Sequence, residues 1–429
     1  MNSTLLLVGT IAASVVSVMA QSAHLHHGLN GQKHVIEKHE GSESGTLINK
    51  FEDSLEQVSD AGVSIAGEYL YEYTNVLNGG VKHGGSDRNL LVFDAEFDLE
   101  TIFGLKGATV FAKYLHVNAE DGGSADAADI QGYTNIESAR SLDVLYEFWF
   151  EQKIADGKYR IKVGKVDANS EFNYVDAGGN FSNSSAGFSP TIFTLPTYPN
   201  PAMSVNVFAT LAENDGAAFT LGYGLYDGGA AVDGVETGRR GPSSYFSGDS
   251  SNDYFHILQG EQTWDGIFSL GEGRLSGGAW YHTGDFESFS GGSESGTYGF
   301  FFNAEQRLTT RGEDSAEGLY AFAQFATADE NLSEVSQHLA LGLMSEGTLA
   351  CRTSDSAGIY MTYVNLSDDP YANDGAGFAK DECAIDAFYR FQINEHFAVQ
   401  PELQYIINPS GSTDVSDALI GGVRFSAAF

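Results

Sequence analysis

Apolar and polar side chains alternate along many short segments of this chain, and the segment 418–429 shows the pattern clearly. One of its faces is mostly apolar, and the opposite face carries Arg424. Successive residues of a β-strand point to opposite sides of a sheet, and this segment ends on the aromatic residue Phe429. The pattern suits a membrane β-barrel, in which the outer face is apolar against lipid and the inner face can hold charge.

The same alternation, bounded by Gly, Asn and Asp turns, recurs often enough to predict about sixteen strands, an even number as in single-chain bacterial barrels. The fold class we expect is therefore an all-β, transmembrane, antiparallel barrel. The predicted strands lie near residues 63–74, 90–99, 108–118, 142–154, 159–167, 203–211, 217–226, 254–264, 273–282, 297–308, 318–328, 337–345, 358–365, 382–393, 397–408 and 418–429.

The connections between these strands alternate in length. Connections after even-numbered strands are mostly short, as at 155–157, 214–216 and 394–396, whereas several after odd-numbered strands are long and polar, as at 118–139 and 168–202. Short periplasmic turns and long extracellular loops are typical of a membrane barrel, and a soluble sandwich has no reason to show them.

Charged residues of the predicted strands share one face. In 397–408, for example, Gln400, Glu402 and Gln404 oppose apolar residues. A Lys or Arg on the lipid side costs roughly 2–4 kcal/mol at the bilayer midplane, so the charged face must line the lumen. The same alternation in 142–154 predicts that Glu147 faces the lumen and that Tyr146 faces lipid.

The amino-terminal part of the chain has a different character. Residues 1–20 contain an apolar run and small residues before Gln21, which predicts an export signal peptide, although no Lys or Arg precedes the run. Residues 21–60 form a polar lead-in with helical spacing near 47–55, followed by the barrel at 61–429. The lead-in carries histidines that can bind metal, but a flexible periplasmic segment is favoured and no cofactor is predicted; these residues are His24, His26, His27, His34 and His39.

Composition narrows the range of partners. The net charge of -36 at pH 7 argues against nucleic acid. Acidic loops are explained by solvation, but they also allow divalent-cation bridging at the cell surface or a bias against anions in a pore. The two cysteines, Cys351 and Cys383, fall at opposite ends of predicted strands, so we expect two free thiols.

Two blocks of the chain resemble a known family, the carbohydrate-selective porins of the OprB type. The first block contains YEFWFEQKIADGKYRIKVGKVDANSEF, FSNSSAGFSP and PTYPNPA, and the second contains FAVQPELQYIINPSG and ALIGGVRFSAAF. Weaker similarity extends from about Gly62 onward. The resemblance implies a 16-stranded outer-membrane channel that admits sugars by passive diffusion. The histidine-rich lead-in and the acidic loops depart from the family pattern.

Candidate solute contacts gather around the long loop 168–202, which we expect to fold inward and narrow the pore, the alternative being that it caps the rim. On the wall beside it, Glu147 and Glu151 are expected to face Arg160 and Lys162, and Trp149 either stacks on sugar or packs beneath the loop. Cross-strand ion pairing that stiffens the wall is the alternative role for the charged residues. The remaining candidates are Lys165, Asp167, Asn169, Phe172, Asn183 and Ser184 near the loop, and Glu68, Asp94, Glu305, Arg307, Arg390 and Arg424 on other walls.

The sequence therefore favours a porin that passes small carbohydrates across an outer membrane, with outer-membrane lipid around it and a homo-oligomer left open. Carboxylates, bases and aromatic faces along a constriction can all contact sugar hydroxyls and rings. A general diffusion porin and a surface adhesin remain as alternatives. An enzyme is disfavoured, because no Gly-x-Ser-x-Gly elbow accompanies the histidines of the strands, which are His256, His282 and His338.

Overall fold

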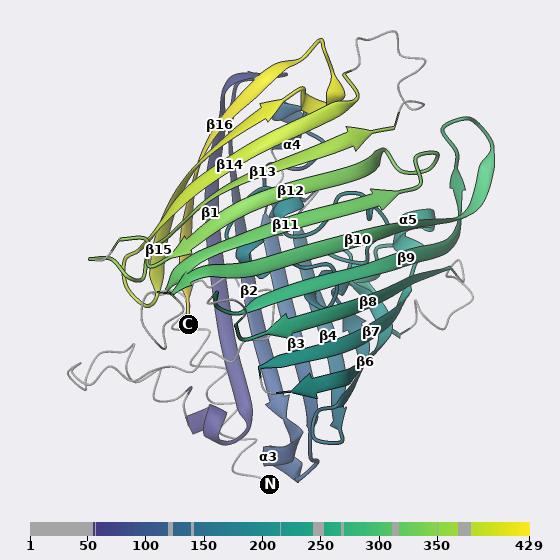
Figure 1. The fold of residues 1–429 in the computed structure, drawn as a ribbon, viewed down its shortest axis with the longest axis vertical. Helices are drawn as coiled ribbons and strands as arrows, with labels where there is room; N and C mark the ends of the chain where they lie inside the picture. Colours follow the sequence, from purple (N-terminus) through teal and green to yellow (C-terminus); the bar gives the residue numbers. More distant parts are fainter. Residues whose placement is uncertain are drawn as a thin grey trace.

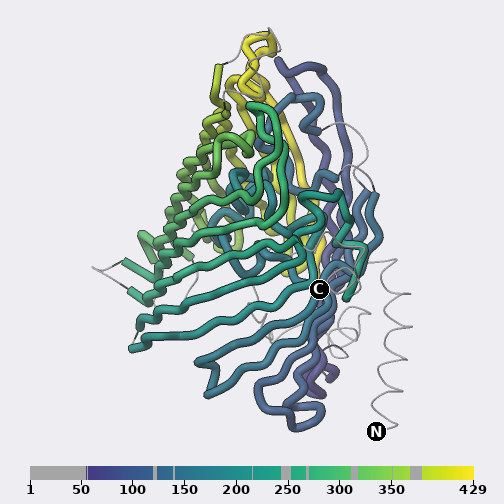
Figure 2. The backbone as a smooth tube through the Cα atoms, turned by 90° about the vertical axis from the view of Figure 1, so that its right-hand side faces the viewer, coloured from purple at the N-terminus to yellow at the C-terminus, as the bar shows by residue number. Residues whose placement is uncertain are grey.

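The computed structural model describes residues 55, 57–118, 123–138, 141–214, 216–242, 253–266, 270–310, 317–349, 351–367 and 379–429. In this part of the chain, sixteen strands form one closed antiparallel barrel, in which each strand pairs with its neighbours in sequence and β16 pairs with β1 (Figures 1 and 2). The all-β barrel and its sixteen strands are confirmed. The predicted leader and histidine tract lie outside the described residues.

The observed strands match the predicted ones closely, and several extend further. β10 is the clearest case, because it begins four residues before the predicted segment 297–308 and ends two after it. The strands are β1 (Val63–Gly80), β2 (Gly85–Asp98), β3 (Ala108–Asn118), β4 (Leu142–Ile154), β5 (Tyr159–Val166), β6 (Ala202–Asn214), β7 (Ala217–Asp227), β8 (Tyr254–Trp264), β9 (Gly273–Glu287), β10 (Ser293–Thr310), β11 (Gly318–Ala328), β12 (Val335–Glu346), β13 (Ser356–Leu366), β14 (Asp381–Gln392), β15 (Phe397–Ile407) and β16 (Ser416–Ala428).

Short helices occupy the connections. α3 (Leu99–Phe103) follows β2, α4 (Ser124–Ala127) lies between β3 and β4, and α5 (Gly229–Asp233) follows β7. Three 3-10 helices, η1 (Ala168–Ser170), η2 (Asp176–Gly178) and η3 (Ser184–Ala186), belong to the loop after β5. Among the described residues, no helix is both long and apolar enough to cross a membrane.

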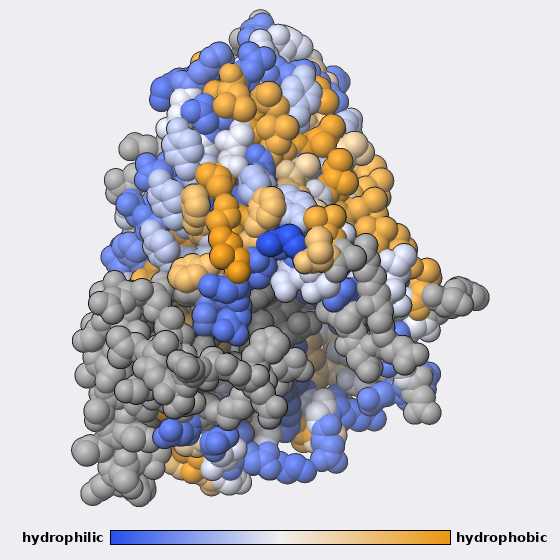
Figure 3. Space-filling view, turned by 90° about the vertical axis from the view of Figure 1, so that its left-hand side faces the viewer, coloured by the Kyte–Doolittle hydropathy of each residue, from blue (hydrophilic) through white to orange (hydrophobic). Residues whose placement is uncertain are grey.

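The two faces of the wall differ as the alternation predicts. Phe300, Ile359 and Leu403 on the outside are left about half uncovered by protein, whereas Asn303 and Gln404 on the inside are buried. Apolar side chains can stay uncovered there because lipid tails are their solvent. Figure 3 shows many of the hydrophobic residues in a band from the upper centre to the right-hand edge of the view, with hydrophilic residues mostly at its top, left and bottom.

The seam between β1 and β16 closes the barrel. Glu72 of β1 lies opposite Arg424 of β16 in the register. Next to the seam, the backbone N–H of Phe429 donates to the carbonyl of Gly67 at 3.3 Å, and the N–H of Gly67 donates back at 3.2 Å. A Cβ atom on Gly67 would lie 2.3 Å from the ring of Phe429, so a glycine is required at this close approach.

Two connections on the same side of the barrel contact its interior. Residues 167–201 join β5 to β6, and residues 123–138 belong to the connection between β3 and β4. Side chains from both segments pack in clusters with lumen-facing residues of the strands, including Phe172 of the first segment and Tyr133 of the second. The apolar core therefore lies inside the barrel, between these segments and the wall.

One predicted orientation is wrong. Strict alternation places Tyr146 on the lipid side, but the register between β3 and β4 shifts between the pairs Lys113–Glu147 and Tyr114–Leu145. Tyr146 is left as the extra residue of a β-bulge, and its side chain is buried inside. A bulge inserts one residue into a strand and so reverses the alternation beyond it.

The two cysteines are both free, as expected. Cys351 is exposed in the connection between β12 and β13, and Cys383 is half-buried on β14.

Candidate functional site

The first group of charges joins β4, β5 and the start of the loop after β5. Arg160 donates to Glu151 at 2.9 Å and to Glu171 at 2.7 Å. Lys162 donates to Glu171 and lies 3.7 Å from Glu151. Burial alone would raise the pKa of Glu171, but the charges and hydrogen bonds of Lys162 and Arg160 lower it to about 2. Two bases and two carboxylates therefore neutralise one another where β4 and β5 meet the start of the loop.

Trp149 belongs to this wall but its ring is already in contact with other side chains. The Nζ of Lys162 lies 3.7 Å from the ring centroid, a cation–π contact, and the ring of Phe111 stacks on it at 4.9 Å. Of the two roles that the sequence leaves open for Trp149, packing beneath the loop fits this geometry better than sugar stacking.

A second group lies on β2, β3 and β4. Lys113 sits between two carboxylates, 3.7 Å from Asp94 and 3.6 Å from Glu147. Glu147 also accepts a hydrogen bond from the backbone N–H of Asp167 at 3.0 Å. The base that pairs with Glu147 is thus Lys113 of β3 and not Arg160 of β5. β3 and β5 are the two strands on either side of β4.

A third group faces the lumen from β8, β9 and β10. Arg274 contacts three carboxylates: it donates to Glu305, and it lies 3.5 Å from Asp176 and 3.7 Å from Glu261. Its guanidinium carbon lies 3.8 Å from the ring centroid of Tyr174, which precedes Asp176 in the loop. The Asp176 side chain remains 58% exposed, so it faces water inside the barrel.

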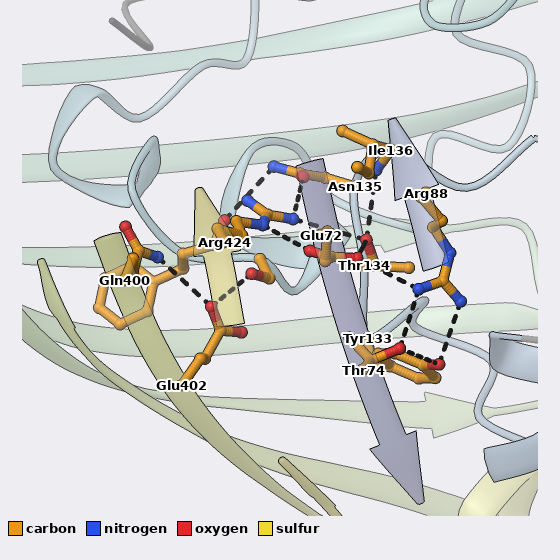
Figure 4. A network of polar contacts seen from close by, with 12 residues as sticks. Glu72, Thr74, Arg88, Tyr133, Thr134, Asn135, Ile136, Gln400, Glu402 and Arg424 are labelled. Atoms are coloured by element: carbon orange, nitrogen blue, oxygen red, sulfur yellow. Dashed lines mark hydrogen bonds and ion pairs between the residues drawn. The ribbon is translucent and has the colours of Figure 1, made fainter. Parts of the chain in front are cut away.

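A buried network on β1, β2 and β16 holds the segment 123–138 (Figure 4). The carboxylate of Glu72 accepts from Arg88 at 3.2 Å and from Arg424. Arg88 also donates to the hydroxyl of Tyr133 at 3.1 Å, and Arg424 donates to the side-chain carbonyl of Asn135 at 2.7 Å. Two arginines from the wall therefore share one carboxylate and use their remaining N–H groups on the segment.

The two inward segments also bind each other. The N–H of Ser184 donates to the carbonyl of Gly132 at 2.8 Å, and the Ser184 hydroxyl donates to the carbonyl of Thr134 at 3.0 Å. Asn135 donates to the carbonyl of Phe181 at 3.3 Å. Movement of one segment therefore breaks hydrogen bonds to the other.

The segment 167–201 follows the inner wall across several strands. The N–H of Ala177 donates to Glu305 of β10 at 2.8 Å, and the N–H of Asn183 donates to Asp386 of β14 at 3.3 Å. Ser182 donates to Glu402 of β15. Since these acceptors lie on strands far from β5, the segment contacts the inner wall at several places across the barrel.

Aromatic rings support the same segment between these hydrogen bonds. Phe172 stacks on Phe208 of β6 with centroids 5.5 Å apart. Near the tip, Phe181 contacts the rings of Phe322, Tyr360 and Phe388 at 5.9, 5.3 and 4.9 Å. Pairs of this kind contribute about 0.5–1.5 kcal/mol each beyond burial of their area.

Comparisons with known proteins agree with this architecture. The model of the carbohydrate-selective porin family, OprB, matches residues 82–429. The chain belongs to the OprB family. It is therefore an outer-membrane channel protein of the Gram-negative type rather than an enzyme, and the predicted family, localisation and class are confirmed.

Individual OprB-type relatives are distant in sequence. The chain is 22% identical to the putative porin QuiX of Acinetobacter baylyi, over 89% of this chain and 93% of the relative. It is also 22% identical to Porin B of Pseudomonas aeruginosa, over 91% and 90%. Its fold is similar to that of OprB of Pseudomonas putida at high pH, with a TM-score of 0.77, 20% identity and coverage of 87% and 96%.

Several predicted site residues of this OprB-family porin serve the loop itself. The Asn169 amide donates to the carbonyls of Phe172, Asn173 and Gly187, so it shapes the turn. Lys165 lies on the face of β5 opposite Arg160 by alternation, and its Nζ donates to the carbonyl of Gly238 at 2.8 Å.

The other predicted residues lie on separate walls. Arg307, two residues beyond Glu305 on β10, pairs with Glu272 at 3.2 Å and so lies next to the group around Arg274. Glu68 on β1 and Arg390 on β14 line the same cavity, together with Asn180 at the loop tip. The structure thus brings Glu68, Arg390 and Arg424 to one side of the passage.

Sequence reasoning missed the segment 123–138, together with Lys113, Arg274 and Glu171. Alternation alone could have found Lys113 and Arg274, because each shares a face with other lumen residues of its strand. Glu171 is in the loop, where alternation says nothing. Among the described residues, no group of three or more His, Cys, Asp or Glu side chains forms a metal site.

Proposed function

We propose that this porin gives passive, sugar-preferring diffusion through a water-filled passage. The passage runs through the barrel beside the segment 167–201. The pairing of charges supports this most directly. Lys113 and Arg274 each contact two carboxylates of neighbouring strands, and Arg160 contacts Glu151 of β4 and Glu171 of the loop.

Local pairing favours uncharged solutes. A general diffusion porin separates acids and bases onto opposite walls, which produces a transverse field across the passage. Here the opposite charges are neighbours, so they present hydrogen-bond donors and acceptors at short range and a weaker field at long range. Sugar hydroxyls can use both kinds of group, whereas a charged solute has little to gain.

The remaining assignments belong to the same proposal. The inward segment contains the constriction, residues 1–20 direct export, and residues 21–60 precede the barrel in the periplasm. The solute contacts lie on the charged side chains that retain exposure to the passage, among them Asp94, Arg160 and Asp176. Small carbohydrates are the substrates.

Liposome swelling with matched solutes tests the proposal. Neutral, anionic and cationic solutes of equal size are compared, with sugar-free vesicles and heat-denatured protein as controls. We expect the neutral sugar to enter fastest. The proposal fails if anions enter as fast as neutral sugars of the same size, and a protein that passes neither sugar nor ions is an adhesin or structural barrel instead.

A charge variant sharpens the test. Arg160→Gln leaves Glu151 and Glu171 with one base fewer, so we expect slower anion entry and a smaller change in sugar entry. The matched control is Lys158→Gln, which removes a positive charge from the exposed turn before β5. An equal effect of both substitutions on anion entry would show that the lumen charge is irrelevant.

A further inference from the structure

We propose that Tyr146, the bulged residue of β4, is a positioning residue that fixes the root of the segment 167–201 and thereby sets the size limit of the pore. The proposal rests on the channel function above, but it concerns the bore of the channel and not its preference for sugar. The bulge gives Tyr146 an unusual place. Leu145 and Phe148 on either side of the bulge are about half exposed on the outer face, whereas Tyr146 and Glu147 are both buried inside.

The two inward side chains of the bulge bind the same residue. The hydroxyl of Tyr146 donates to the Oδ2 atom of Asp167, and Glu147 accepts the N–H of Asp167 at 3.0 Å. Asp167 is the first residue after β5, and its Oδ1 atom caps η1 by accepting from the N–H of Asn169 at 2.9 Å. The direction in which the segment leaves the wall is therefore fixed by hydrogen bonds from two consecutive residues of one neighbouring strand.

Tyr146 also contacts the returning limb of the segment. Its ring lies 6.5 Å from the ring of Tyr198, centroid to centroid, and the Tyr198 hydroxyl donates to the carbonyl of Ile136 at 3.3 Å. Ile136 belongs to the segment 123–138 and packs in the same apolar cluster as Tyr146. One side chain thus connects the outgoing limb, the returning limb and the second inward segment.

The electrostatics of Asp167 make the hydroxyl important. Burial, with the nearby charge of Glu147, raises the pKa of Asp167 to about 6. The carboxylate is thus ionised only at a cost near neutral pH, and the Tyr146 hydroxyl is one of the donors that stabilise it. Without the hydroxyl, the root gains by moving until water reaches the carboxylate, and this movement widens the passage.

The test compares Tyr146→Phe with Tyr114→Phe. Tyr114 offers a matched control, because its hydroxyl also donates to an aspartate, Asp143, at 2.6 Å, but on the outer face of the barrel. The bore is measured by the largest polyethylene glycol that lowers single-channel conductance, and by the ratio of disaccharide to monosaccharide swelling rates. We expect Y146F to raise the ratio about twofold or more and to admit larger polymers, since a hydrogen bond to a charged group is worth a tenfold preference or more. Y114F should match the wild type.

Two further variants separate positioning from simple stability. In Y146F/D167N the buried charge is gone, so we expect the bore to return toward that of the wild type. D167N alone keeps the tyrosine and an acceptor, and it should give a bore between those of the wild type and Y146F, which preserves the test if Y146F does not fold. A purely structural role of Tyr146 would lower the yield of folded channels and leave the bore of each channel unchanged. A wild-type bore in Y146F, or the same change in Y114F, overturns the proposal. If the wild type admits no sugar, the proposed function is wrong. The bore of Y146F can still be compared with that of the wild type by polymer exclusion.

Discussion

The two inward segments reach the same lumen but are held there by different forces. The segment 123–138 is attached to the wall by a buried ionic network, in which Arg88 and Arg424 share the carboxylate of Glu72. The tip of the segment 167–201 is attached by aromatic packing around Phe181. An ionic anchor depends on every partner being present, whereas an apolar anchor loses energy in proportion to the volume removed.

The difference teaches that one anchor is ionic, whereas the other adds aromatic packing to hydrogen bonds with the carboxyl groups of Glu402 and Asp386. Hydrogen bonds between the segments, such as that from Ser184 to Gly132, couple the two anchors. Weakening either one should therefore enlarge the passage, but under different conditions.

Removal of the shared carboxylate should have the largest effect. Glu72→Gln leaves Arg88 and Arg424 buried without their common counter-charge, and breaking a buried pair in this way costs about 3–5 kcal/mol. We expect a lower temperature for the heat-induced loss of the folded form on gels and faster disaccharide entry. Asp156→Asn is the control, since it breaks an ion pair with Lys106 in which both side chains are mostly exposed. A wild-type unfolding temperature in E72Q would contradict the assigned role of the network.

Acidification should weaken the contacts at the root of the segment 167–201, around Glu171, more than the aromatic contacts at its tip. The folded-state pKa of Glu171 is about 2, against an ordinary value of 4.5, so folding favours the ionised form. This contribution is present above pH 4.5 and is lost as the pH falls toward 2, by about 3 kcal/mol. We expect the wild type to lose stability over this window relative to Glu171→Gln, measured by unfolding at pH 7, 4 and 2.5.

The pH dependence of stability expected from Asp167 has the opposite sign to that expected from Glu171, so the two residues check each other. Its folded-state pKa is raised to about 6, so folding favours the protonated form, and stability increases as the pH falls from 7 to 5. Asp167→Asn should remove this increase and leave the loss below pH 4.5 in place. Identical pH profiles in the wild type and both variants would show that neither carboxyl group is coupled to folding.

A substitution in the aromatic anchor should cause the smallest loss of stability. Phe181→Leu keeps an apolar side chain but loses contact with the rings of Phe322 and Phe388. We expect the free energy of unfolding to fall by about 1–2 kcal/mol. The loss should be the same at pH 7 and pH 4, unlike the loss at Glu171. Phe300→Leu on the lipid-facing side is the control and should leave the bore unchanged. A pH-dependent loss in F181L would show that the packing of Phe181 is coupled to the carboxyl groups bound by Ser182 and Asn183.

The alternation of apolar and polar residues predicted most of the fold, because each strand has one face in lipid and one in water. It located all sixteen strands and the lumen position of residues such as Arg424 and Glu402. It could not locate the bulge at Tyr146, because an extra residue in a strand leaves no mark in the pattern of residue types. The register, which depends on pairing with β3, decided the face.

The site was less predictable than the fold. The charges on β4 and β5 were found because they alternate with apolar residues, and the contacts of Glu151 with Arg160 and Lys162 agree with the expected facing of these residues. The other two partners were missed, since Glu171 is in a loop and Lys113 is on the other neighbouring strand. The segment 123–138 looks like any polar loop. Its attachment depends on Tyr133 and Asn135 meeting arginines of β2 and β16, which are far away in sequence.

The pairing of β1 with β16 has a consequence for how the molecule is made. These two strands lie at opposite ends of the described chain, so the contact that turns a curved sheet into a ring has a sequence separation close to the length of the barrel. Such a contact gives a high contact order and slow folding. Until β16 has been synthesised and delivered, β1 presents an open edge, and the ring with its passage does not yet exist.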